Sequence, residues 1–393
     1  MDLLALVMEI FAVGMTIGGI VYSLLALRSA QDFERVRPGK MELTGLVPGV
    51  SILKPVKGVD PRMYAGLASH CVQQYAGEVE LLFGVSSVED EAVAQVARLR
   101  VEHADSDRLT IRLVECTERL GTNGKVSNLA QMLKEARFEH VIVNDSDIVV
   151  SPNYLERVMA PFARQGVGLV TVPYFGRAEN TLWSRMEALG IATDFMPGVL
   201  VARKLEHGLH FGLGSTLATT KTALASIGGF EALVDQLADD YELGARLANA
   251  GWQVELVHEV VATTVPAYTL RGFCEHQLRW ARSTRDSRRA GYVGLGVTYV
   301  LPWAFAAAVA SGFALWSWTL LSLALLLRVA VALKVGVGLL RDGQVLRDMV
   351  LLPLRDCFGL MFWAWSYAGD TIVWRGERFR LQRGKLQRVA EGS

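Results

Sequence analysis

Several features that would point to a particular class of protein are missing from this sequence. The 40 basic residues are balanced by 40 acidic ones, so the net charge gives no indication of nucleic acid as a partner. Only four cysteines occur in 393 residues, and their spacing fits neither a zinc site nor a disulfide framework. No internal repeat or low-complexity segment is evident. We therefore expect free thiols in a reducing compartment and no nucleic acid partner.

What the sequence has in excess is apolar residues, which make up 51% of it and give a mean hydropathy of +0.27. Residues 3–27 form an apolar run broken only by Glu9, about long enough to cross a ~30 Å hydrocarbon core. A signal peptide would be shorter and would begin with basic residues. Here the basic residues follow the run, at Arg28, Arg35, Arg37 and Lys40. We predict a membrane anchor over residues 1–30, followed by a cytoplasmic domain.

A second apolar block lies in the last quarter of the chain. Residues 297–340 carry few charges and predict two spans joined by a tight turn near residues 311–312 or 316–318. The segment that follows contains Arg355 and Asp356, which could form a buried pair in a bundle or mark a re-entrant or interfacial helix. We predict transmembrane and re-entrant helices over 291–370. A basic cytoplasmic tail over 371–393 would lie beside anionic headgroups.

Between these blocks, residues 48–290 have the pattern of an α/β domain. Short apolar runs predict buried strands, and helix-like stretches separate several of them, which favours a largely parallel sheet covered on both faces. The predicted strands are 49–53, 79–85, 109–114, 140–143 and 167–172, and the predicted helices include 91–102 and 127–136.

Asp145 and Asp147 follow the apolar run 140–143 and are two residues apart, so an extended chain presents both on one side. Carboxylate oxygens are the ligands that magnesium and manganese prefer, and a metal there could bridge to a diphosphate. A nucleotide-sugar transferase needs such a site, because negative charge develops on the leaving diphosphate. The alternative is an ordinary solvated turn after a strand.

Two further groups of side chains could take part in chemistry. Asp239 and Asp240 begin a predicted helix that ends near residue 250, where an acid could act as general base or could simply stabilise the helix start. His276, Arg279 and Trp280 share one face of a helix predicted from about 269 to 289. That face suits a phosphate and an apolar ring, and it also fits an amphipathic helix at the membrane surface.

The loop Gly121-Thr-Asn-Gly-Lys125 opens a helix that includes Asn128. Backbone amides at a helix start together with a lysine could hold a phosphate, although the glycine spacing is not that of a P-loop. The alternative is a turn with a helix cap. A turn in the core is the favoured interpretation of the Gly212-Leu-Gly214 stretch.

Taken in order, these segments resemble glycosyltransferase family 21, which includes ceramide glucosyltransferases and bacterial enzymes that glycosylate hopanoid lipids. The resemblance covers about residues 50–290, flanked by the two apolar blocks. The motifs that carry it are Leu53-Lys-Pro-Val-Lys-Gly-Val-Asp-Pro61, Asn123-Gly-Lys-Val-Ser-Asn-Leu129, Asp145-Ser-Asp147, Ile227-Gly-Gly-Phe230, Asp239-Asp-Tyr241, Arg279-Trp280 and Trp374-Arg-Gly376.

The resemblance implies a GT-A fold, a nucleotide-diphospho-sugar transferase domain that works by inverting transfer. Asp145 and Asp147 would hold Mg²⁺ or Mn²⁺ and the diphosphate of a UDP-sugar, and Lys125 and Asn128 would lie beside the nucleotide. Asp240 would be the general base. Arg279 and Trp280, with His276, would close the site near the membrane.

This sequence departs from the family pattern in two places. Where the family usually has an aspartate that touches uridine, Ser86-Ser87 stand here, and Glu89 or Asp90 would have to substitute. His276 stands where Gln or Arg often opens the last motif. This form resembles the bacterial branch and predicts a bacterial inner membrane location.

We therefore predict an integral membrane enzyme that moves glucose or N-acetylglucosamine from a UDP-sugar to a lipid hydroxyl, with ceramide or a hopanoid as acceptor. A processive polysaccharide synthase shares the same acids and the Arg-Trp pair, but it needs enough spans to form a polymer channel. The alternative from another class is an inactive membrane protein that only binds nucleotide sugars.

Overall fold

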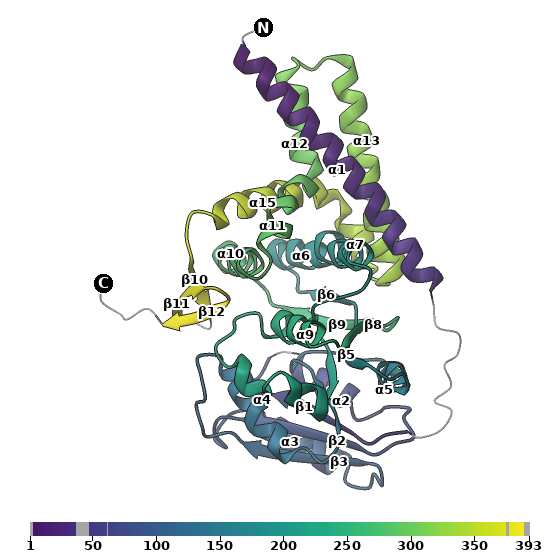
Figure 1. Ribbon diagram of the computed structural model, residues 1–393, viewed down its shortest axis with the longest axis vertical. Helices are drawn as coiled ribbons and strands as arrows, with labels where there is room; N and C mark the ends of the chain where they lie inside the picture. Colours follow the sequence, from purple (N-terminus) through teal and green to yellow (C-terminus); the bar gives the residue numbers. More distant parts are fainter. Residues whose placement is uncertain (1–2, 37–46, 61, 375–376, 389–393) are drawn as a thin grey trace.

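The computed structural model describes residues 3–36, 47–60, 62–374 and 377–388. Long helices stand together at one end of the molecule, and a mixed sheet with its covering helices forms the other end (Figure 1). A layer of helices lies between the two ends. α1 begins at the tip of the helical end, whereas β12, the last described element, lies at about mid-height (Figure 1).

The main sheet has seven strands in the order β3-β2-β1-β4-β7-β5-β8. All of them run in the same direction except β7, which is antiparallel to both of its neighbours. The strands are β1 (Val50–Pro55), β2 (Val79–Val85), β3 (Leu109–Glu115), β4 (His140–Val143), β5 (Val167–Thr171), β7 (Leu217–Thr220) and β8 (Gln253–Leu256).

All five strands predicted from apolar runs are present and point the same way, and the two predicted helices are also found. β1, β2, β4 and β5 are almost wholly buried, as expected for strands covered on both faces. The covering helices are α2 (Met63–Ser69), α3 (Ala92–Glu102), α4 (Gly124–Glu135), α5 (Tyr154–Met159), η1 (Ala160–Ala163), α8 (Lys221–Ser226), η3 (Phe230–Leu233) and α9 (Asp239–Asn249).

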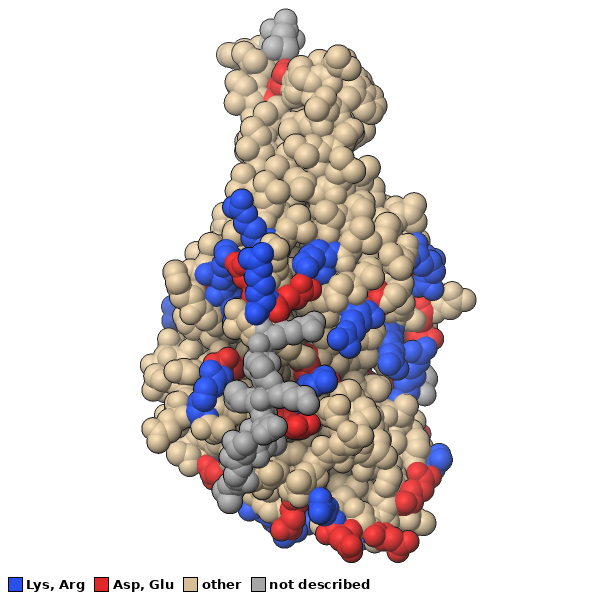
Figure 2. Space-filling view, turned by 90° about the vertical axis from the view of Figure 1, so that its right-hand side faces the viewer, with Lys and Arg blue, Asp and Glu red and all other residues tan. Residues whose placement is uncertain are grey.

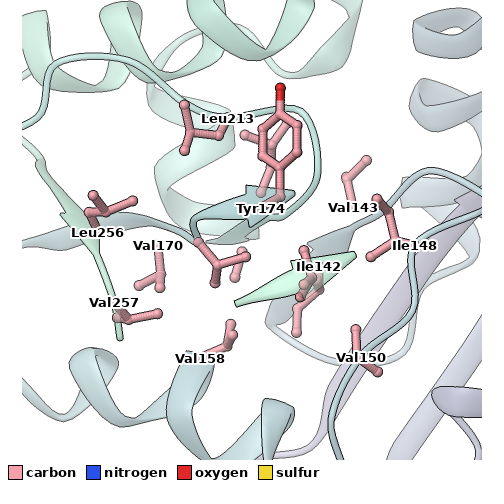
Figure 3. Close-up of a cluster of buried hydrophobic side chains, with 14 of the residues drawn as sticks. Ile142, Val143, Ile148, Val150, Val158, Val170, Tyr174, Leu213, Leu256 and Val257 are labelled. Atoms are coloured by element: carbon pink, nitrogen blue, oxygen red, sulfur yellow. The ribbon is translucent and has the colours of Figure 1, made fainter. Parts of the chain in front are cut away.

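The core of this half lies between the sheet and these helices. Figure 3 shows Ile142 from β4, Val170 from β5, Leu256 from β8 and Val158 from α5 pointing into one apolar cluster. All four side chains are buried. This packing fixes the carboxyl end of β4, from which the acidic loop departs.

A layer of helices separates the main sheet from the long apolar helices. It contains a two-stranded parallel sheet of β6 (Tyr174–Ala178) and β9 (Val261–Val265). Its helices are α6 (Leu182–Gly190), the π-helix η2 (Ile191–Phe195), α7 (Met196–Leu205) and α10 (Leu270–Ser287). α10 confirms the helix predicted from about residue 269 to 289, and Thr269 caps its start.

Within the described part of the chain, two helices are long and apolar enough to cross a membrane, namely α1 (Leu3–Arg35) and the continuous stretch Leu315–Leu339. The second consists of α13 (Leu315–Val331) and the π-helix η4 (Ala332–Leu339). A bent pair, α11 (Arg289–Thr298) and α12 (Val300–Ala310), counts as a third span only if its 54° kink is included. Figure 2 shows this end of the molecule almost free of charged side chains.

The predicted turn near residues 311–312 is found between α12 and α13, where Gly312 adopts a φ of 63°. The first of the two predicted spans is not one long helix in the structure, because α12 on its own has only 11 residues. The backbone breaks at Tyr299, and Asp356 accepts a hydrogen bond from the N–H of Leu301 in the first turn of α12.

The segment after η4 contains Arg355 and Asp356, and each of them forms a buried ion pair with a residue of another helix. It contains α14 (Gln344–Asp348), η5 (Met349–Leu351) and α15 (Leu352–Ser366), and α15 lies across the direction of α1 and α13 (Figure 1). Asp356 pairs with Arg328 of α13, with a shortest N–O distance of 2.5 Å. Arg355 pairs with Asp194 of η2 at 2.9 Å. These two ion pairs therefore hold α13 and α15 together and hold α15 against the middle layer.

The segment predicted as a basic tail contains an antiparallel sheet of β10 (Thr371–Trp374), β11 (Glu377–Gln382) and β12 (Lys385–Arg388). Phe379, Leu381 and Leu386 form its buried face, and the basic residues lie mainly on the exposed face. Arg375 and Gly376 of the Trp-Arg-Gly motif lie outside the described residues. The sequence analysis did not foresee this sheet, and its proximity to headgroups stays a prediction.

Candidate active site

The loop that carries the paired carboxylates is fixed at its base by Asn144. This buried side chain donates to the carbonyl oxygen of Ser215 (2.7 Å), to the hydroxyl of Thr216 (3.0 Å) and to that of Tyr154 (3.1 Å). An amide with so many partners in a buried site is rigid. Asp145 and Asp147 therefore leave β4 along a defined path.

Asp147 is held by β9 on the far side of the loop. Its Oδ2 accepts from the hydroxyl of Thr263 (2.6 Å) and from the N–H of Thr264 (2.7 Å). Burial and the neighbouring charge of Asp145 raise the pKa of Asp147, and these hydrogen bonds oppose the rise. The two threonines were not singled out in the sequence, because only the fold brings β9 beside β4.

Lys125 connects the two acidic groups that the sequence pointed to. Its Nζ lies 2.9 Å from Oδ1 of Asp145 and 3.4 Å from Oδ2 of Asp239. Burial alone would lower the pKa of Lys125, but the two carboxylates outweigh it and hold that pKa above its usual range. Asn123 caps this start of α4 by accepting from the N–H groups of Lys125 and Val126.

Lys54 is a buried cation that the sequence analysis did not select, although a lone lysine in an apolar strand was a signal for it. Its Nζ donates to the carbonyl oxygen of Asp145 at 3.0 Å, from beneath the acidic loop. Burial lowers the pKa of Lys54 to about 7, against the opposing effect of Asp147 and Asp145. Two lysines thus flank this loop.

Asp240 lies at the start of α9, against a glycine turn. A Cβ added at Gly214 would lie 2.9 Å from Oδ2 of Asp240, so any other residue there would crowd this carboxylate. Burial and the adjacent Asp239 raise the pKa of Asp240 to about 6, and Lys125 opposes them. The Gly212–Gly214 turn is therefore more than a turn in the core, because it forms one wall beside this acid.

The predicted face of α10 is present and meets a buried acid from α6. Nδ1 of His276 lies 3.3 Å from Oε1 of Glu187, and the side chain of Gln277 also donates to Glu187. Burial alone would raise the pKa of Glu187, yet the influence of His276 and Arg355 leaves it lowered. Glu187 is another residue that was not predicted from the sequence, since its spacing in α6 carries no distinctive signal.

Aromatic side chains pack around the face of α10 that carries His276 and Trp280. Trp280 packs on Phe195 with ring centroids 5.6 Å apart, and His276 lies 5.8 Å from Trp280. Burial raises the pKa of Tyr268, with Arg279 lowering it and Asp147 raising it. The charges of Arg279 on α10 and of Asp147 in the acidic loop thus both act on the hydroxyl of Tyr268.

The side of the site that was expected to bind uridine contains fewer of the predicted side chains. Ser86 and Asn128 are hydrogen-bond partners at 3.4 Å. Oδ1 of Asp90 accepts from the N–H groups of Gly58 (2.8 Å) and Ala92 (2.9 Å), so it ties the loop after β1 to α3. Glu89 is exposed. Asp90, one of the two candidates to replace the family aspartate, is therefore already occupied by hydrogen bonds that hold the fold together.

The acidic loop fits a divalent metal only together with a ligand. Among the described residues no group of three or more His, Cys, Asp or Glu side chains could enclose an ion. Asp147 is fixed by β9, and the side chain of Asp145 is 45% exposed. Magnesium commonly uses one or two carboxylates and completes its shell with water and phosphate oxygens. The loop therefore suits a metal bound with a diphosphate.

A nucleotide-binding α/β sheet with paired acids after β4 and a further acid on α9 is the arrangement of a GT-A glycosyltransferase. The solved mannosyltransferase PcManGT from Pyrobaculum calidifontis, in complex with GDP-Man and Mn²⁺, aligns with 91% of this chain and 99% of its own. The TM-score is 0.54 at 19% identity, which shows a shared fold. The GT-A fold is thus confirmed.

The family model for glycosyl transferase family 21 matches residues 11–387. This chain belongs to that family, and it is a glycosyltransferase. Ceramide glucosyltransferase 1 of Caenorhabditis elegans is 24% identical over 90% of this chain and 76% of its own length. An N-acetylglucosaminyltransferase of Bradyrhizobium diazoefficiens is 25% identical over 62% of this chain and 50% of its own length. The predicted family is confirmed.

Proposed function

We propose that this enzyme transfers a hexose from a UDP-sugar to a hydroxyl group of a membrane lipid by an inverting single displacement. The observation that carries the proposal is the contact of Lys125 with both Asp145 and Asp239, next to Asp240. It brings the acids expected at the donor diphosphate beside the acid expected at the acceptor. The relatives named for ceramide support a lipid acceptor.

Donor binding is assigned to the loop after β4. Asp147, oriented by Thr263 and Thr264, and the more exposed Asp145 would hold a divalent metal with the diphosphate. The bound metal would neutralise the charge that develops on the leaving diphosphate. Lys125 adds a positive charge at the same edge, and a buried ammonium acts strongly there because little water screens it.

Asp240 is assigned as the general base. A lipid hydroxyl has a pKa far above 7, so it attacks well only as its proton passes to a nearby carboxylate. Gly214 leaves room beside Oδ2 of Asp240, where any larger residue would crowd it. The ionised form of Asp240 takes the proton, and the nucleophile then displaces the diphosphate from the opposite face of the sugar carbon.

The acceptor is assigned to the side of the site that adjoins the apolar helices. α10 packs against α6 and α15, and Trp280 with Phe195 offers an apolar surface to a lipid. Ceramide and a hopanoid are the two acceptor classes, and glucose and N-acetylglucosamine are the two sugars. One relative is named as a ceramide glucosyltransferase and another as an N-acetylglucosaminyltransferase, so the proposal includes both sugars.

The orientation in the membrane follows from charge. Arg28 and Arg35 in the last part of α1 and Lys334 in the first turn of η4 lie at the same end of the spans, where Lys334 contacts Glu34. Basic residues favour the cytoplasmic side, so the sheet-containing half faces the cytoplasm, where UDP-sugars are made. The bacterial inner membrane is the proposed location.

The experiment is an incubation of the purified protein in lipid vesicles with UDP-glucose or UDP-N-acetylglucosamine, and with ceramide or a hopanoid. Mass spectrometry should find one new glycolipid that carries a single hexose. A long polymer instead would identify a processive synthase. Release of free sugar, or no turnover of any UDP-sugar, would contradict transfer to a lipid.

A further inference from the structure

The segment that leads into α9, residues 234–238, is held on one side by the loop before α4. Thr122 donates to Oδ1 of Asp235 from its N–H and from its hydroxyl, both at 2.9 Å. The buried side chain of Asn123 donates to the carbonyl oxygen of Gln236 at 2.8 Å. These bonds connect the segment before Asp240 with the loop that carries Lys125.

The other side of residues 234–238 is held by the turn between β11 and β12. The N–H of Leu237 donates to the carbonyl oxygen of Gly384 (3.0 Å), and the N–H of Leu386 donates to that of Asp235 (2.9 Å). The turn uses Arg383 and Gly384 with φ angles of 51° and 79°, as in tight two-residue hairpins. The segment is therefore paired to the C-terminal sheet like a short extra strand.

The side chain of Leu237 completes the apolar face of this sheet. It is buried there in a cluster with Ile372, Phe379, Leu381 and Leu386. A three-stranded sheet with so few apolar residues has little core of its own. The sheet and the segment before α9 thus depend on each other for burial.

The same sheet also contacts α10. Asp286 accepts from the N–H of Gly384, and Arg282 donates to the carbonyl oxygen of Thr371 in β10. Figure 1 shows the sheet beside α10, at the foot of the chain that descends from α15. One small sheet therefore joins α10, which carries Arg279 and Trp280, to the segment that places Asp240.

We propose that the β10–β12 sheet is a positioning element for the transfer step. It fixes the distance between Asp240 on α9 and the acceptor face of α10. The inference rests on the proposed function, in which these two elements act on the same acceptor. The donor nucleotide is assigned to the loop after β4 and to Lys125, which is held there by Asp145 and Asp239. Loosening the sheet should therefore slow transfer while nucleotide binding persists.

Two substitutions loosen the sheet in different ways. Gly384→Val puts a branched side chain at a positive φ, where its Cβ would lie 2.8 Å from Oε1 of Gln236. Leu237→Ala removes the side chain that fills the sheet's apolar face. The matched control is Gly251→Val at the far end of α9, which imposes similar strain at a φ of 91° with nothing within 4 Å of the new Cβ.

The measurements are kcat and KM for transfer to lipid, the affinity for UDP, and the melting temperature, each for the full chain in vesicles. We expect kcat to fall on the order of 10²-fold for Gly384→Val and less for Leu237→Ala. KM for the donor and the affinity for UDP should stay within about twofold, with the control close to the parent enzyme.

Three results would overturn the inference. They are unchanged kcat in both sheet variants, an equal loss of kcat in the Gly251→Val control, and a joint fall of kcat and UDP affinity. The last result, which includes failure to fold, would mean that the sheet only supports the domain. If the parent enzyme itself transferred no sugar to lipid, the proposed function would fail instead, which the same assay reveals.

Discussion

Asp239 and Asp240 are neighbours in the chain, but their carboxylates lie in different surroundings. Asp239 contacts Lys125 at 3.4 Å, whereas Asp240 accepts from the N–H of Tyr241 at 2.8 Å and faces Gly214. Lys125 occupies Oδ2 of Asp239, whereas Oδ2 of Asp240 faces the space beside Gly214. The structure thus gives a physical reason for choosing Asp240 as the base.

Asp240→Asn keeps the shape of the side chain but cannot accept the proton. We expect kcat for transfer to fall by roughly 10²–10⁴ while the affinity for UDP changes little. Asp239→Asn is the control, and it should cost much less in steady-state turnover above pH 7. Equal and mild effects of the two substitutions would move the base to another residue.

The pKa of Asp240, raised to about 6 by burial and by Asp239, predicts the acid side of the pH profile. Below this pH the carboxyl is protonated and cannot accept a proton, so kcat should fall about tenfold per pH unit. Asp239→Asn removes a like charge and should move this limb to lower pH. A limb that stays in place or moves upward would show that another group controls it.

The metal prediction concerns Asp145, Asp147 and the threonine that orients the second of them. Alanine at either aspartate, or a chelator, should lower the rate on the order of 10²–10³. Thr263→Val keeps the volume but removes the 2.6 Å hydrogen bond to Asp147. It should raise the metal concentration for half-maximal activity about 10–100-fold. Full activity in chelator would exclude the metal-dependent mechanism.

At the scale of elements, the junction between α13, α15 and η2 depends on one arginine. Arg328 contacts Asp356 at 2.5 Å and Asp194 at 2.7 Å, and it is almost completely buried. Arg328→Met would leave the buried carboxylate of Asp356 without its partner, whereas Asp194 would keep its ion pair with Arg355. We expect a loss of about 3–5 kcal/mol in the free energy of unfolding, measured by denaturation in lipid nanodiscs.

Lys334→Met is the matched control for that substitution. Lys334 pairs with Glu34 between η4 and α1, and both side chains are partly exposed, at 35% and 27%. Pairs of this kind contribute at most about 1 kcal/mol. Equal losses for the two substitutions would contradict the assignment of Arg328 as the junction between the spans and the middle layer.

The sequence was informative where one element decides the structure by itself. Apolar runs located β1, β2 and β4, and the doublet after β4 located Asp145 and Asp147. β7 was missed because it is short and half of it is threonine, which also suits a loop. Its antiparallel direction depends on pairing with strands far away in the chain, which no local pattern encodes.

The missed site residues share a cause. Lys54, Glu187 and Thr263 have their significance only through partners on other elements, so their own positions carry weak signals. The C-terminal sheet was hidden in the same way. Its many arginines suggested a basic tail beside anionic headgroups, and the alternation of Phe379 and Leu381 becomes meaningful only when Leu237 covers that face.

At the scale of the whole molecule, the turn between α12 and α13 and the start of α1 lie at one end, and the three described sheets lie toward the other (Figure 1). A cysteine at Ser311 should therefore react with an impermeant thiol reagent added outside intact cells. The natural Cys71 of the sheet-containing half, which is partly exposed, should react only after lysis. The opposite pattern would invert the proposed topology.

The pairing of β12 with the segment before α9 also has a consequence for biosynthesis. Translation runs from the N-terminus, so β12 emerges from the ribosome after every other described element. Until then, Leu237 is not buried against the C-terminal sheet, and the segment that leads to Asp240 is held only by the loop before α4. The nascent chain can insert its spans and fold its nucleotide-binding sheet first. Competence for transfer would come late in maturation, when the chain is already in the membrane beside its proposed acceptor.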